Sequence, residues 1–98
     1  MVVGVLRLEL KLHAAHSLKE KRAVVKRVLG RCRERFPVSC AEVGGQGLWQ
    51  LSELGFTMVA VDEPSIDRVF QKIEGEIDSL GLADICARDV EYLHYGQR

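Results

Sequence analysis

The chain has 98 residues, of which 47% are apolar and 29% charged, and its 14 basic and 14 acidic side chains leave a formal net charge of zero. This length predicts one domain over residues 1–98, large enough to bury a core without disulfides or metals. No apolar run reaches the roughly 18 residues that a membrane-spanning helix needs, so no membrane association is expected. Three cysteines without paired spacing indicate a reducing compartment, and we expect a cytoplasmic protein.

The first predicted element is a strand over Val3–Leu12. Leucines alternate there with Arg7, Glu9 and Lys11. This period of two is typical of a strand that buries one face. The charges inside the apolar pattern also argue against a signal peptide.

A basic helix is predicted next, over Ser17–Phe36. Ser17 and Glu20 have the spacing of a capping box, and Pro37 ends the helix. The segment holds eight Lys or Arg and two Glu, a local charge of +6. Residues 1–35 carry a net charge of +7 and residues 36–98 carry −7, so the neutral total hides a strong asymmetry.

Two strands, a helix and a last strand complete the chain. The runs Val38–Val43 and Leu51–Val61 are strand-like, and the glycine-rich Gly44–Gly47 between them favours a hairpin loop. A second helix is predicted after Asp62-Glu63-Pro64 and ends at Gly81. Its apolar stripe contains Ile66, Val69, Phe70, Ile73, Ile77 and Leu80. The last strand, "ADICARDVEYLHY", changes phase near Arg88-Asp89, which indicates a bulge.

The order β-α-β-β-α-β predicts an α+β, ferredoxin-like fold, with a four-stranded antiparallel sheet and both helices on one face. The other face is then open. Four valines are expected to form an apolar surface there, extended by Trp49 and Leu51: Val3, Val5, Val59 and Val61. Such a surface favours a homodimer. The alternatives are a different partner, or a mistaken strand phase that would place these valines in the core.

One flank of the basic helix carries a row of four cations. At 100° per residue, the row lies beside the apolar stripe and is about 20 Å long. It consists of Lys19, Arg22, Lys26 and Arg33. Such a row can follow the phosphates of RNA or DNA. The alternative is that the charges are solvated, or paired with an acidic flank of the second helix formed by Asp67, Glu74 and Asp78.

Lys21 differs from the row because it falls inside the apolar stripe, in the first helical turn. Its stem could simply cross apolar surface at the sheet edge. Alternatively, its ammonium joins Ser17, Lys19 and Arg22 in an anion-binding pocket at the helix N-terminus.

Other motifs predict no chemistry. His13 and His16 lack a third ligand nearby, so they are interpreted as loop residues and no metal is expected. "GGQG" matches the tripeptide of peptide-release factors over only three residues. "LGFTMVAV" partly matches an RNA-recognition signature but lacks the stacking aromatics. No catalytic constellation is present, so neither an enzyme nor a cofactor is expected.

With "SLKEKR" opening the basic helix and "AEVGGQGLWQLSELGF" across the hairpin, the chain resembles the YlxP-like family of small bacterial proteins, a domain of unknown function. The resemblance implies a ferredoxin-like fold. It also implies a genetic context of translation initiation and ribosome maturation, hence ribosomal RNA or a ribosomal protein as partner. Our leading hypothesis is a cytoplasmic accessory factor of ribosome assembly or translation that binds RNA or a ribonucleoprotein through the basic helix. The alternatives are an anion-binding regulatory domain and a homodimeric interaction protein.

Overall fold

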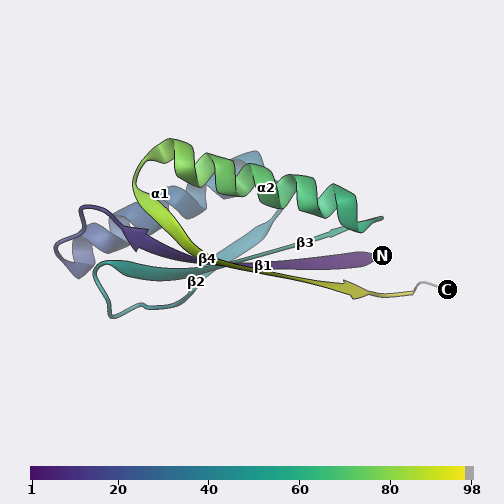
Figure 1. Ribbon diagram of the computed structural model, residues 1–98, viewed down its shortest axis with the longest axis horizontal. Coiled ribbons are helices and arrows are strands. Elements are labelled where there is room, and N and C mark those ends of the chain that lie inside the picture. Colours follow the sequence, from purple (N-terminus) through teal and green to yellow (C-terminus); the bar gives the residue numbers. More distant parts are fainter. Residues whose placement is uncertain (97–98) are drawn as a thin grey trace.

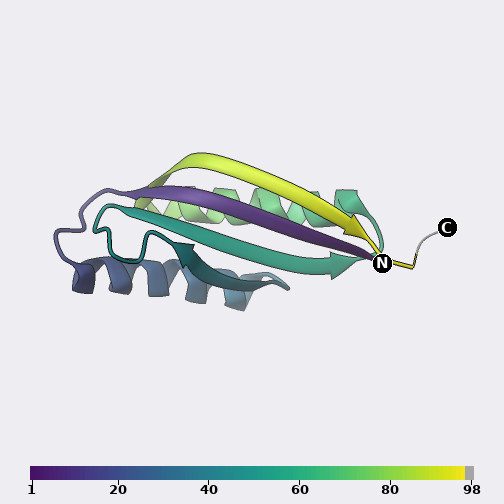
Figure 2. The ribbon, with the colours of Figure 1, turned by 90° about the horizontal axis from the view of Figure 1, so that it is seen from below.

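The computed structural model describes residues 1–96 and shows six elements, of which four strands form a single sheet and two helices pack on it. Their order is β1 (Val2–Leu12), α1 (Leu18–Arg35), β2 (Ser39–Gly44), β3 (Leu51–Ala60), α2 (Glu63–Leu80) and β4 (Ala83–His94). The sheet order is β2-β3-β1-β4, and each neighbouring pair is antiparallel. Both helices cover the same face, with α1 on the β2 side and α2 on the β4 side (Figure 1, Figure 2). The ferredoxin-like prediction is confirmed. Neither helix has an apolar stretch long enough to cross a membrane.

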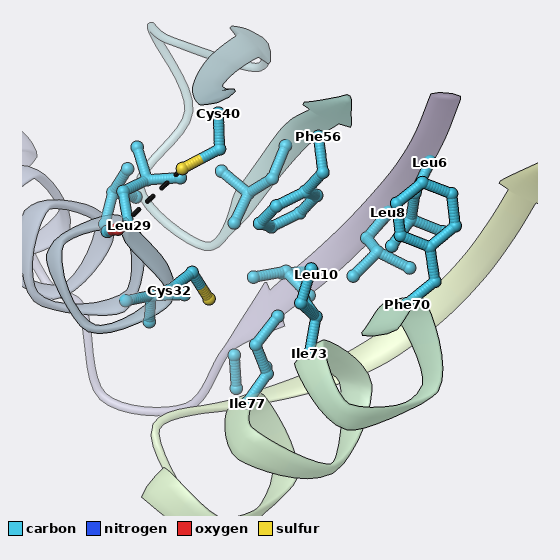
Figure 3. Packing of buried hydrophobic residues seen from close by; sticks show 14 of the residues in the cluster. Leu6, Leu8, Leu10, Leu29, Cys32, Cys40, Phe56, Phe70, Ile73 and Ile77 are labelled. Carbon is cyan, nitrogen blue, oxygen red and sulfur yellow. Dashed lines mark hydrogen bonds between the residues drawn. The ribbon is translucent and has the colours of Figure 1, made fainter. Parts of the chain in front are cut away.

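The core lies between the helices and the buried face of the sheet (Figure 3). The alternating leucines of β1 point into it, and Leu6 and Leu8 are fully buried. Phe56 of β3 and Phe70 of α2 pack in the same layer. Because β1 pairs with a strand on each side, its buried residues lie in the middle of this core.

Side chains cap the first turn of both helices, and sequence analysis predicted the cap at Ser17 and the end of α2 at Gly81. The Ser17 hydroxyl accepts a hydrogen bond from the Glu20 N–H at 3.1 Å, and the Glu20 carboxylate accepts one from the His16 N–H at 2.6 Å. Asp62 caps α2 by accepting from the Ser65 N–H at 2.9 Å. Gly81 ends α2 in the left-handed region, at φ 67°.

The bulge in β4 lies earlier than predicted. Glu9 pairs with Ala87 and Leu10 with Ile85, so Cys86 is the extra residue, and Arg88-Asp89 lies in regular register. The bulge changes the phase of the strand, so that Ala83 and Ile85 on one side of it and Val90 on the other all turn toward the helices.

Gly4 offers a test of the contact between β1 and α2. A Cβ at Gly4 would collide with the Ile66 side chain and lie 3.1 Å from Phe70 Cζ, whereas a Cβ at Gly75 on α2 would meet nothing within 4 Å. Gly4→Ala should therefore lower the free energy of unfolding by about 1–3 kcal/mol. Gly75→Ala, the matched control, should raise it by about 0.5–1 kcal/mol, because alanine favours a helix interior. Urea denaturation measures both, and an unchanged Gly4→Ala variant would contradict the packing described.

Candidate nucleic-acid interface

The predicted row of cations lies on the flank of α1 that faces away from α2. Lys19, Arg22 and Lys26 are exposed in the first half of the helix. Arg33 is also exposed, and it donates a hydrogen bond to the Cys40 carbonyl of β2 at 2.7 Å. That bond places this flank along the β2 edge of the sheet (Figure 2). The sequence places the row there because the buried residues of α1, such as Val28 and Cys32, fix which side meets the sheet.

No carboxylate of residues 1–96 forms an ion pair with Lys19, Arg22 or Lys26. The charges of α2 are matched elsewhere: Asp67 and Glu74 contact Arg88 of β4, at 3.6 and 2.7 Å. The alternative in which Asp67, Glu74 and Asp78 pair with the row is therefore wrong, and the row is exposed to solvent. Three cations of the row are left as an exposed positive surface.

A different flank of α1 carries the ion pairs between the helices. Arg31 and Arg35 each contact the Glu76 carboxylate of α2 at 2.7 Å. The hydrogen bond from Arg31, and after it the one from Arg35, holds the pKa of Glu76 below its usual value. Glu76 reciprocally raises the pKa of Arg31. The basic helix is thus divided into a flank that is neutralised within the fold and a flank that is not.

Lys21 is buried in a polar network, an arrangement that sequence analysis missed. Its side chain is 1% exposed, and its ammonium donates to the Gly45 carbonyl and lies 3.1 Å from a Glu42 carboxylate oxygen. The Ser52 hydroxyl donates to the same Glu42 oxygen at 2.6 Å. The position of Lys21 inside the apolar stripe was the one available signal, because nothing in the sequence identifies Glu42 as its partner.

The predicted anion pocket does not assemble around Lys21. The Ser17 hydroxyl is used by the helix cap, and the ammonium of Lys21 turns inward, toward the hairpin between β2 and β3. Lys19 and Arg22 stay on the exposed flank. The correction has a simple physical cause: a buried ammonium needs an anionic partner, and Glu42 supplies one from within the chain.

The predicted open face is open, and the strand phase is confirmed. Val5, Val59 and Val61 are 39%, 59% and 86% exposed, and Val3 is half-buried. The alternative that these valines belong to the core is wrong. Trp49, however, precedes the start of β3 at Leu51, whereas Val59 lies near the end of that strand. Trp49 is therefore at the opposite end of the sheet and does not extend the valine surface.

Arg7 lies in the middle of the open face and contacts three carboxylates. Its guanidinium donates to Glu53, to Glu9 at 2.6 Å and to Asp89 at 2.7 Å. The hydrogen bond to Glu53, followed by that to Glu9, raises the pKa of Arg7. This cluster has a formal charge of −2, so the open face carries the sign opposite to that of the row on α1.

The described residues form several open hollows, and one of about 460 Å³ is lined by residues 47–51 of the hairpin. A hollow of about 240 Å³ at the loop end of the open face is lined by Glu9, Leu48, Glu53 and Cys86 among others, but both carboxylates already contact Arg7. Within residues 1–96, no three His, Cys, Asp or Glu side chains are grouped so that they could hold a metal ion.

Comparisons with known proteins agree on the family and the fold. The model of the family described as "Protein of unknown function (DUF503)" matches residues 3–90. The chain is 37% identical over 78 residues to "Uncharacterized protein YlxP" of Bacillus subtilis (strain 168), a match that covers 80% of this chain and 85% of that protein.

Solved structures with low sequence identity show the same fold. The structural-genomics protein YJCS has a TM-score of 0.63 and 11% identity, with 94% of this chain and 99% of that chain covered. A de novo designed protein, LFR1 1, with a ferredoxin fold has a TM-score of 0.61 and 18% identity, with 100% and 91% covered. These likenesses concern the fold alone.

The Lys21 network predicts a clear effect on stability. Lys21→Met should lower the free energy of unfolding by about 2–4 kcal/mol, because it leaves the partly buried Glu42 without its cation. The double variant Lys21→Met with Glu42→Gln should recover part of that loss, which a double-mutant cycle measures. Lys26→Met on the exposed flank is the control, expected within about 0.5 kcal/mol of wild type. Equal stability of the Lys21 and Lys26 variants would contradict the network.

The Glu76 pairs predict a dependence on pH. The pKa of this carboxyl is lowered in the folded state, so its stabilisation is present above the ordinary value of 4.5 and is lost as the pH falls through the folded pKa. Glu76→Gln should therefore be less stable than wild type at neutral pH and should lose less stability on acidification. Urea denaturation of wild type and of the Glu76→Gln variant over a pH series measures both free energies of unfolding. If the two free energies changed with pH in parallel, Glu76 would not be the source of the pH dependence.

Proposed function

Because the chain belongs to the DUF503 family, a family of unknown function, its role must be inferred from its own surface, and we propose that it binds the phosphate backbone of structured RNA through α1. In this proposal the protein is a cytoplasmic accessory factor of ribosome assembly or translation, and its ligand is ribosomal RNA, alone or within a ribonucleoprotein. The supporting observation is that Lys19, Arg22 and Lys26 are exposed and have no anionic partner within the described chain.

The geometry favours a backbone contact without base reading. The three side chains lie at positions i, i+3 and i+7 of one helix, so they share one flank and follow its axis. Arg33 continues the row two turns later, although its guanidinium already binds the Cys40 carbonyl. Helix α1 itself carries no aromatic side chain within Leu18–Arg35 to stack on a base, so the contacts proposed for it are electrostatic.

Charge reversal tests the proposal. The triple variant Lys19→Glu, Arg22→Glu and Lys26→Glu should bind ribosomal RNA much more weakly than wild type. The slope of log K against log salt concentration should fall in magnitude by about 2–3, because about 0.7–0.9 of a counterion is released per phosphate contact. Filter binding at several potassium chloride concentrations measures both quantities.

A matched triple variant controls for total charge. Arg27→Glu, Arg68→Glu and Lys72→Glu change the net charge by the same amount, at exposed cations outside the row. This control should keep most of the affinity. Wild-type affinity that does not depend on salt, or an equal loss in both triple variants, would contradict a specific role for the row.

A further inference from the structure

The start of β1 and the ends of β3 and β4 lie together at one end of the sheet (Figure 2), and a group of exposed large apolar side chains belongs to this end of the open face. The strand register places Val59 and Leu93 on either side of Val3, in one row across three strands. We call this surface the apolar end. Its exposed large side chains are Met1, Val5, Val59, Val61, Leu93 and Tyr95. At this end, reciprocal backbone hydrogen bonds of 2.9 and 2.8 Å join Met1, which precedes β1, to Tyr95, which follows β4.

The charges of the open face lie mostly beyond the apolar end. Arg7 and its partners Glu9, Glu53 and Asp89 occupy the middle of the sheet, with a formal charge of −2. Glu91, opposite Val5 on β4, marks the border between the two parts. The face is therefore divided along the strands into an apolar end and an acidic middle.

We propose that the apolar end binds the same surface of a second copy of this chain. A two-fold axis that runs across the strands at the apolar end would pack the apolar end of one copy against the apolar end of the other. The acidic middles of the two copies would then lie on opposite sides of this contact, away from each other. Complete overlap of the two faces would instead bring like charges together, which is unfavourable. The division of the face thus favours a second copy in an offset arrangement, with a self-complementary contact.

The size of the surface is adequate for such a contact. Six exposed side chains of these types offer on the order of 500 Å² of apolar area, at the upper end of what monomers leave uncovered. A stable interface buries about 800 Å² on each partner. The half-buried Val3 and the neighbouring polar groups of Thr57 and Glu91 supply the remaining rim.

In this dimer the two sheets would face each other and the helices would lie outside. The cation rows of the two α1 helices would then be on opposite outer surfaces, free to contact RNA. Dimerisation does not require the RNA-binding proposal, and the two can fail separately: the dimer contact is apolar and should tolerate salt, whereas phosphate contacts weaken steeply with salt.

Sedimentation velocity of the full chain, over a concentration series at high salt and without RNA, tests the proposal. Wild type should sediment with twice the chain mass. Val59→Lys and Leu93→Lys should raise the dimer dissociation constant by a hundredfold or so, because each buries a charge in the contact of both copies. Val43→Lys is the matched control, an equally exposed valine of the same face on β2, outside the apolar end, and it should remain dimeric.

A wild-type chain that stays monomeric at every concentration would overturn the proposal and leave the surface to a different partner. A dimer that persists in both Lys variants would place the contact elsewhere and overturn it as well. Methyl NMR of wild type on dilution needs no substitution and covers the case of an unfolded variant. The resonances of Val3, Val5, Val59 and Leu93 should shift with concentration while those of Val43 do not, and the reverse pattern would refute the contact.

Discussion

The alternation of side chains along β1 divides the sheet into a buried face and an open face. Leu6, Leu8 and Leu10 are buried beneath the helices, while Arg7 and Glu9 between them face the opposite side of the sheet. Strand β1 pairs with β3 on one side and with β4 on the other. A shift of β1 by one residue against these strands would turn Arg7 and Glu9 toward the core. This one strand therefore fixes the register of β3 and β4, whereas β2 takes its register from β3.

The same alternation sorts the charges between the two faces. Asp89 lies beside Arg7 on the open face, and its neighbour Arg88 turns to the helix side, where it contacts Glu74 of α2. Between the helices, Arg31 and Arg35 of α1 both form ion pairs with Glu76 of α2. Local pairing thus removes these carboxylates of α2 from competition, which is why the opposite flank of α1 keeps its positive charge although the chain as a whole is neutral.

Sequence analysis predicted the features that depend on local periodicity and missed those that depend on distant partners. The cap at Ser17, the end of α2 at Gly81 and the outward phase of Val5 and Val59 follow from residues close in the chain, and the structure confirms them. The pairing of Lys21 with Glu42 joins a helix to a hairpin, so no local pattern contains it.

The two errors of position have related causes. An irregular phase shows that a bulge exists, but the extra residue could be any of several until the pairing with β1 identifies Cys86. Trp49 and Val59 are both near β3, yet a strand of this length carries them to opposite ends of the sheet, about 30 Å apart at 3.3 Å per residue. Direction along a strand, and not only the face, decides which side chains share a surface.

A neutral chain can still attract a polyanion through one flank, because distance and salt limit how far each charge acts. The Debye length is about 8 Å at physiological ionic strength, and a helix packed on a sheet is a layer of roughly 10 Å. The carboxylates around Arg7 lie on the far side of the sheet from α1 and are largely screened from a ligand at the helix surface. Such a ligand at the cation row would experience mainly Lys19, Arg22 and Lys26. Its attraction should therefore be short in range and steep in salt, and independent of the net charge of the chain.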